Sequence, residues 1–172
     1  MVCFPNLNFN VDVNRCFGWL WKCRRRHKTG IKIGPFGGAG TRSFDTGGSA
    51  APIARVKLRT GTVIYSLQIT YHTNRRDVET DLLGGEGGDS HYTFELRPGE
   101  YINLMTGCVR EYNGETCITK LEFYTNLNVR HGPFGKADGR KFNVPVINGR
   151  IVGFFGRYSR YLNEIGVYLA PN

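Results

Sequence analysis

An all-β fold made of three packed sheets is the fold class that this sequence predicts, and three observations support it. The 172 residues include 23 glycines, 9 tyrosines and 11 phenylalanines. This mixture suits short strands and tight turns, because glycine adopts positive φ and aromatic side chains fit pleated, half-buried surfaces. A glycine-rich motif also recurs three times, and residues 31–172 show no sustained helical periodicity with caps. A chain of this length can bury a single-domain core without metal or disulfide bonds.

The glycine-rich motif recurs at a regular spacing of about 50 residues, which indicates an internal repeat. Residues 34–40 (GPFGGAG) resemble residues 132–139 (GPFGKADG), and residues 84–88 (GGEGG) lie midway between them. Apolar residues recur at equivalent positions after each motif: Phe44, Phe94 and Phe142, then Ile53, Ile102 and Ile151, then Ile64, Ile118 and Leu162. The number of matching positions indicates that the domain is built from three similar units.

Within a repeat, the pattern predicts strands at short spacing. Residues 53–58 alternate apolar and polar side chains, residues 59–61 turn the chain, and residues 63–71 form a second strand. The middle repeat is expected to do the same with a longer loop at 111–115. Each repeat would expose an apolar face if left alone, so three units should pack these faces inward as a triangular prism. Loops from different units then gather at one end, where a site can form.

The charge of the chain divides it into two parts. The net charge is +9, and residues 1–30 hold six Lys or Arg against one acid. We therefore expect a basic N-terminal extension with Cys and Trp residues over 1–30, and one domain over 31–172. Tryptophans precede the cluster Arg24, Arg25 and Arg26, which is compatible with an anionic membrane surface, a polyanion or a nuclear-localisation patch. A solvated extension is the structural interpretation that we favour.

The cysteines, histidines and acidic residues indicate which cellular locations and which classes of function to expect. The five cysteines are an odd number, and neither a secretory leader nor an apolar run of about 20 residues is evident. We expect a cytoplasmic protein, or a nuclear or membrane-peripheral one through its extension. Cys108 and Cys117 flank a hairpin as either a disulfide or a reduced pair. The histidines lack metal-ligand spacing and the acids are scattered, so we expect no metal, no cofactor and no enzyme.

Three stretches resemble the jacalin-related lectins: residues 33–40 (IGPFGGAG), 131–139 (HGPFGKADG) and 151–171 (IVGFFGRYSRYLNEIGVYLAP). The resemblance covers residues 31–171 in one register. It implies the β-prism I fold, with three four-stranded antiparallel Greek-key sheets and pseudo-threefold symmetry. It also implies carbohydrate binding without catalysis, with glycans or glycoproteins as partners. Homo-oligomer formation and a role in stress or defence are expected by analogy. The uncut chain favours the mannose/glucose-type class over galactose-preferring members, which are cut.

The resemblance also implies where a sugar would bind. In mannose-type members, a Gly-x-x-x-Asp loop binds the sugar beside a glycine-rich loop, and a further loop tunes specificity. The predicted sugar-binding residues are Gly40, Thr41, Ser159, Arg160, Tyr161, Leu162 and Asn163. The predicted specificity loop contains Tyr112, Asn113 and Gly114. Thr41 and Ser159 stand where the family has glycine, and Asn163 stands where it has aspartate.

These departures predict a weakened or re-specified site. A carboxylate can accept hydrogen bonds from two sugar hydroxyls, and an asparagine at 163 replaces that charge at a cost of about 1–2 kcal/mol. Two alternatives remain: a protein-interaction module that has lost sugar binding, and a binder of sulfated or phosphorylated glycans through Arg157 and Arg160. A second site of the same kind is not expected, because the matching stretch 61–65 ends in Tyr65.

Overall fold

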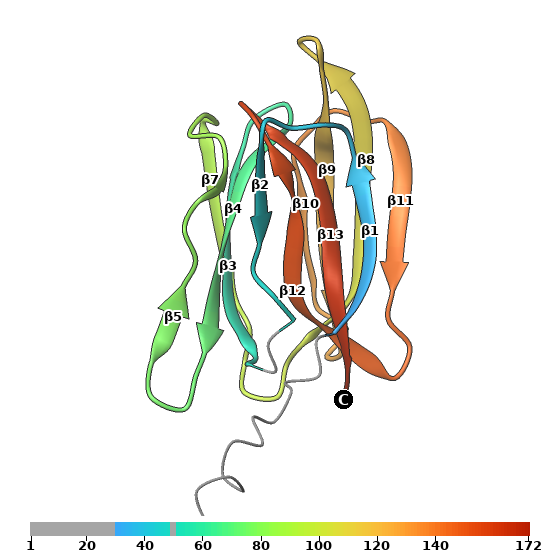
Figure 1. Ribbon diagram of the computed structural model, residues 1–172. Coiled ribbons are helices and arrows are strands. Elements are labelled where there is room, and N and C mark those ends of the chain that lie inside the picture. Colours follow the sequence, from blue (N-terminus) through green and yellow to red (C-terminus); the bar gives the residue numbers. More distant parts are fainter. Residues whose placement is uncertain (1–29, 49–50) are drawn as a thin grey trace, which may run out of the picture.

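Three antiparallel sheets form the sides of a prism in this computed structural model, which describes residues 30–48 and 51–172 (Figure 1). The first sheet has the order β1 (Ile31–Gly37), β13 (Leu162–Pro171), β12 (Gly149–Tyr158), β2 (Arg42–Asp45). The second has the order β10 (Arg130–Phe134), β9 (Glu115–Thr125), β8 (Ile102–Tyr112), β11 (Arg140–Pro145). The third has the order β5 (Asp77–Glu79), β4 (Ile64–His72), β3 (Ile53–Thr60), β7 (Ser90–Glu95), with β6 (Leu83–Gly84) also on β4.

The predicted all-β fold of three antiparallel sheets is therefore confirmed, with one difference of detail. Two sheets have four strands, as expected, whereas the third has five. Its additional strand arises because β5 and β6 both pair with β4, at different places along it.

A sequence repeat does not coincide with a sheet, which differs from the expectation that each unit folds as its own sheet. The first repeat places β1 and β2 in one sheet and β3 and β4 in another. The strands β1 and β2 flank the hairpin of β12 and β13, which belongs to the third repeat. Each repeat thus supplies the edges of one sheet and the central hairpin of the next, so the ends of the domain are fastened together.

Repeat-equivalent residues form the core between the sheets. Ile64, Ile118 and Leu162 have no exposed surface, and Phe44, Phe94 and Phe142 are also buried. Burial alternates along β3 and β9, as expected for strands with one face toward the core. The repeats therefore converge on one hydrophobic interior, and their hairpins lie at the same end of the prism.

The middle hairpin is tighter than the sequence predicted. Strand β8 runs to Tyr112 and β9 begins at Glu115, so only Asn113 and Gly114 form the turn. Their φ angles are 51° and 79°. Two consecutive positive φ values are typical of the type I′ turn, and Asn-Gly is its preferred sequence. The predicted longer loop is therefore a long hairpin that extends from one end of the molecule (Figure 1).

Of the two alternatives for Cys108 and Cys117, a disulfide or a reduced pair, the structure has the reduced pair. Cys108 and Cys117 are both free and buried, and the register places Cys108 opposite Lys120 and Cys117 opposite Arg110.

The basic extension, including Arg24, Arg25 and Arg26, lies outside the described residues. Over residues 30–48 and 51–172, no helix is long and apolar enough to cross a membrane. The same residues contain no cluster of His, Cys, Asp or Glu that could hold a metal ion.

Candidate carbohydrate-binding site

A second, small hydrophobic cluster joins the hairpins of all three repeats at the loop end. It consists of Val63, Cys117 and Tyr161, which precede the repeat-equivalent residues 64, 118 and 162 by one position. Tyr65 and Tyr112 pack edge-on against Tyr161, with ring centroids 5.1 and 5.4 Å from its own. Burial raises the pKa of the Cys117 thiol to about 11, so it remains a neutral apolar group. The cluster fixes the positions of the loops relative to one another.

Glycine is required where the first loop, between β1 and β2, meets the third repeat. Gly37 has a φ of 130°, which L side chains rarely adopt. The next residue, Gly38, donates its backbone N–H to the Asn163 carbonyl over 2.9 Å. At Gly40, a Cβ atom would lie 2.6 Å from the Tyr158 nitrogen. The first loop can therefore reach the β12–β13 loop only because these positions lack side chains.

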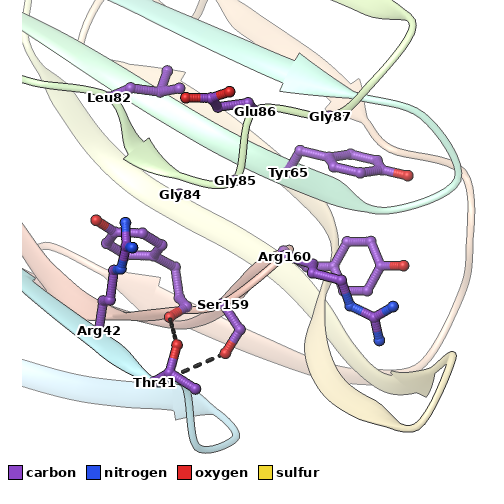
Figure 2. Close-up of a pocket in the computed structure, with 12 residues that line it drawn as sticks. Thr41, Arg42, Tyr65, Leu82, Gly84, Gly85, Glu86, Gly87, Ser159 and Arg160 are labelled. Carbon is purple, nitrogen blue, oxygen red and sulfur yellow. Dashed lines mark hydrogen bonds between the residues drawn. The ribbon is translucent and has the colours of Figure 1, made fainter.

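Thr41 and Ser159, two of the predicted site residues, are hydrogen-bonded to each other. The Thr41 backbone N–H donates to the Ser159 hydroxyl over 3.0 Å, and the Thr41 hydroxyl lies 3.5 Å from the Tyr158 carbonyl (Figure 2). Glycines at both positions could not make the Ser159 bond. The two residues that depart from the family pattern thus tie the two loops together, and the Thr41 N–H already has an acceptor.

Asn163 is fully buried and hydrogen-bonded to the middle hairpin. Its Nδ2 atom donates to Glu115 Oε2 and to the Thr116 carbonyl, each over 3.1 Å. Its Oδ1 atom is buried and has no partner among the described residues. An aspartate could not donate these two hydrogen bonds, so the amide is matched to its surroundings. The Asn163 side chain has no exposed surface at which to meet a ligand.

Glu115 places a carboxylate beside the predicted site. Its Oε1 atom accepts a hydrogen bond from Arg160 Nε over 2.8 Å, and Arg160 Nη2 also reaches the Asn113 carbonyl at 3.3 Å. Donation from the Asn163 amide, and then from the Arg160 guanidinium, holds the pKa of Glu115 below its ordinary value. The Glu115 side chain is 21% exposed. Asn163, Glu115 and Arg160 therefore form one hydrogen-bonded chain across two repeats.

The remaining predicted residues contribute in different ways. No protein acceptor is found within the described residues for the backbone N–H groups of Arg160 and Tyr161, so both can donate to a ligand. The Tyr161 side chain is buried in the small cluster, and its hydroxyl accepts from Asn113 Nδ2 over 3.1 Å. The Leu162 side chain lies in the core with no exposed surface. Asn113 of the predicted specificity loop therefore contacts the β12–β13 loop directly.

Sequence reasoning missed Glu115, Arg42 and the loop 84–87. Glu115 and Arg42 each lie one position beyond a predicted residue, and repeat alignment alone does not place them. The loop 84–87 was noted as the middle glycine motif, but its position beside Arg160 follows from the prism: a Cβ at Gly85 would overlap the Arg160 carbonyl. The glycines of residues 84–88 could have indicated that this loop packs against another segment, since glycine clusters are typical of close backbone approach.

Comparison with known proteins decides the family. Residues 33–168 match the family model described as a jacalin-like lectin domain. The chain belongs to this family. A jacalin-like lectin domain therefore occupies most of the described residues, and the resemblance in the glycine motifs and the C-terminal stretch is confirmed. The family consists of lectins, which bind carbohydrates without catalysis.

The relatives of this jacalin-like lectin domain include a longer protein and solved structures of similar length. A mannose/glucose-specific lectin from Parkia pendula is 34% identical over 149 residues, which cover 83% of this chain and 32% of that protein. The chain thus spans about a third of the length of that relative. The wild-type Malaysian banana lectin structure superposes with a TM-score of 0.77 at 39% identity, covering 83% of this chain and 99% of that one.

A further solved structure is that of a lectin with mannose bound. The mannose-specific jacalin-related lectin from Morus nigra, in complex with mannose, matches with a TM-score of 0.75 at 29% identity. It covers 82% of this chain and 94% of that one. These neighbours confirm the β-prism I architecture for this jacalin-like lectin domain.

Proposed function

We propose that this protein binds neutral mannose- or glucose-type sugars weakly, at the surface where the first loop meets the β12–β13 loop. The observation that carries the proposal is the contact between these loops, in which the Thr41 N–H donates to the Ser159 hydroxyl. Beside that contact, the backbone N–H groups of Arg160 and Tyr161 lack protein acceptors within the described residues. Backbone donors on a rigid scaffold can bind the ring and hydroxyl oxygens of a sugar.

Relatives support the ligand class. The Parkia pendula protein is named a mannose/glucose-specific lectin, and the Morus nigra protein is described with bound mannose. The Morus nigra structure also shares the β-prism fold of this chain. Neutral hexoses are therefore the first ligands to test.

Weak affinity follows from the donors and acceptors that are already paired. Thr41 N–H is bonded to Ser159, and the Asn163 amide is bonded to Glu115 and Thr116. Position 163 thus lacks the accessible carboxylate that strengthens hydrogen bonds to sugar hydroxyls. We expect a dissociation constant in the millimolar range, corresponding to about −4 kcal/mol.

Calorimetric titration with methyl α-mannoside tests the proposal. The native chain should bind at millimolar concentrations, and Gly40→Ala should lose binding, because the added Cβ would lie 2.6 Å from the Tyr158 nitrogen and displace the first loop. Gly61→Ala is the matched control, since a Cβ at Gly61 meets only the Tyr65 ring at 3.4 Å. The control should bind as the native chain does.

Two outcomes would contradict the proposal. If the native chain gave no heat when methyl α-mannoside or methyl α-glucoside was added to about tenfold above a millimolar dissociation constant, the site would not be a neutral-sugar site. The alternative of a protein-interaction module would then be favoured. Equal binding by Gly40→Ala would place the sugar elsewhere.

A further inference from the structure

A groove lies beside the β12–β13 loop, and Thr41, Ser159, Arg160 and Tyr161 of the candidate site form part of its lining. It has a volume of about 720 Å³ and is lined by residues from four places in the sequence. Arg42 lies on one wall, and Leu82 and Glu86 lie on the other (Figure 2). Tyr158 also lines the groove. Small-ligand sites typically have volumes of about 300–1,000 Å³. The groove is therefore large enough for a sugar.

Between these walls, the loop 84–87 packs closely against Arg160 and Tyr65. Gly85 packs against the Arg160 carbonyl so tightly that a Cβ would overlap it, and Gly87 packs in the same way against the Tyr65 ring. Gly85 also donates its N–H to the Tyr65 carbonyl over 3.0 Å. The loop 84–87 is thus held firmly against the β12–β13 loop, and the groove is a built feature of the prism.

Arg42 offers an unpaired cation in the groove. It lies at the start of β2, directly opposite Tyr158 of β12, so both side chains stand on the same face of the sheet. Arg42 makes no ion pair or side-chain hydrogen bond with the described part of the chain, although six other Lys and Arg side chains there have carboxylate partners. A guanidinium binds carboxylate and sulfate groups through two parallel N–H donors.

The two arginines predicted to bind an anion are less suitable. Arg160 is paired with Glu115 at 2.8 Å. Arg157 lies opposite Glu164 on β13 and lines a different hollow, together with Asp45 and Glu164, rather than this groove. Arg42 is therefore the cation beside this loop that is free to bind an anionic ligand.

The opposite wall favours a sugar over a bare anion. Glu86 is exposed, and its carboxylate has no hydrogen-bond partner among residues 30–48 and 51–172. Its backbone carbonyl accepts from Arg59 Nη1 over 2.8 Å, which fixes the position of the residue. A carboxylate accepts hydrogen bonds from hydroxyls and repels a free anion. One wall thus suits an anionic group, and the facing wall suits hydroxyls.

We propose that this groove is a binding site for a sugar that carries a sulfate or carboxylate group. Arg42 binds the anionic group, Glu86 accepts hydrogen bonds from the hydroxyls, and the sugar ring lies against Tyr158. The groove shares Thr41, Ser159, Arg160 and Tyr161 with the candidate site but does not include the buried Asn163. This proposal therefore rests on the proposed function for its location, while Arg42 and Glu86 supply the contacts to the charged sugar.

Titration followed by amide NMR tests the site with three probes: glucose 6-sulfate, glucuronic acid and inorganic sulfate. The sugar anions should shift the amides of Arg42 and residues 84–87, and their affinity should fall as salt is raised, because salt screens exposed charges. Inorganic sulfate should bind more weakly than either sugar, since it gains nothing from Glu86. The ratio of the two sugar affinities identifies which anionic group the groove prefers.

Matched variants complete the test. Arg42→Gln should weaken both sugar anions about tenfold, whereas Arg75→Gln, which removes the same charge from an exposed position between β4 and β5, should leave them unchanged. Shifts spread over the whole basic surface, or equal losses in both variants, would overturn the proposal and indicate attraction by net charge alone. Methyl α-mannoside carries no anionic group for Arg42, so its binding to Arg42→Gln should equal its binding to the native chain. Mannoside binding without sugar-anion binding would overturn only this proposal, and sugar-anion binding without mannoside binding would contradict only the neutral-sugar proposal.

Discussion

At the scale of single residues, the candidate site contains three residues that differ from the family pattern, Thr41, Ser159 and Asn163, and each of them is hydrogen-bonded. Ser159 accepts the Thr41 N–H, and Asn163 donates to Glu115 and Thr116. Each departure from the family pattern has a partner from another repeat. Reverting one residue alone would therefore remove a hydrogen bond before it restored a sugar contact.

Asn163→Asp is expected to destabilise the fold by about 2–3 kcal/mol, because a buried carboxylate would face the Glu115 carboxylate and the Thr116 carbonyl without a donor. Urea unfolding measures this loss. The double variant Glu115→Gln/Asn163→Asp should recover most of the stability, since the new amide donates to the new carboxylate. Asn143→Asp, at an exposed position of β11, is the control and should change stability little. A single variant as stable as the native chain would contradict the assigned hydrogen bonds.

At the scale of elements, the loops are fixed by contacts between repeats. The small cluster of Val63, Cys117 and Tyr161 joins the three hairpins, and the edge strands β1 and β2 pack on the hairpin of β12 and β13. The first loop depends on only a few hydrogen bonds to the β12–β13 loop. It is therefore the element in which a single bond should matter most for local order.

Ser159→Ala should lower the unfolding free energy by about 0.5–1 kcal/mol, the usual net value of one hydrogen bond. It should also speed hydrogen exchange at the Thr41 amide, which loses its acceptor. Ser43→Ala, on an exposed position of the adjacent strand, is expected to change neither quantity. Unchanged exchange at Thr41 in Ser159→Ala would show that the two loops are not joined by this bond in solution.

At the scale of the whole molecule, the pKa shifts set how stability depends on pH. Burial lowers the pKa of His131, whose ring stacks on Phe94 with centroids 4.1 Å apart, although the Glu100 charge opposes this shift. The unfolded chain then binds a proton that the folded chain resists, so stability should fall as pH drops below about 6.5. The pKa values of Glu100, Glu115 and Glu122 are lowered, so their contribution should be lost below about pH 4.5.

His131→Gln should remove the decline in stability that begins below about pH 6.5, while leaving the steeper decline at acidic pH. Urea unfolding of the native and variant chains across pH 4–8, in steps of about half a unit, measures both regions. His91→Gln, on an exposed position of β7, should retain the native profile. A His131→Gln profile parallel to the native one would assign the decline to another group.

The sequence by itself determined the fold class, the repeat and the core. Periodic apolar residues such as Ile64, Ile118 and Leu162 are buried wherever the repeat places them, because strand alternation and apolar burial act through local pattern. It also located both loops of the candidate site, since glycine clusters and a family-like C-terminal stretch are readable along the chain.

Only the tertiary structure decided how those residues are used. It showed that a repeat supplies strands to two sheets, that Asn163 is buried against Glu115, and that Arg42 and Glu86 face each other across a groove. These relations join residues from different repeats, and their distances depend on how the sheets pack. Hydrogen bonds and charge pairing act over a few ångströms, so their partners are fixed only once the three sheets have come together.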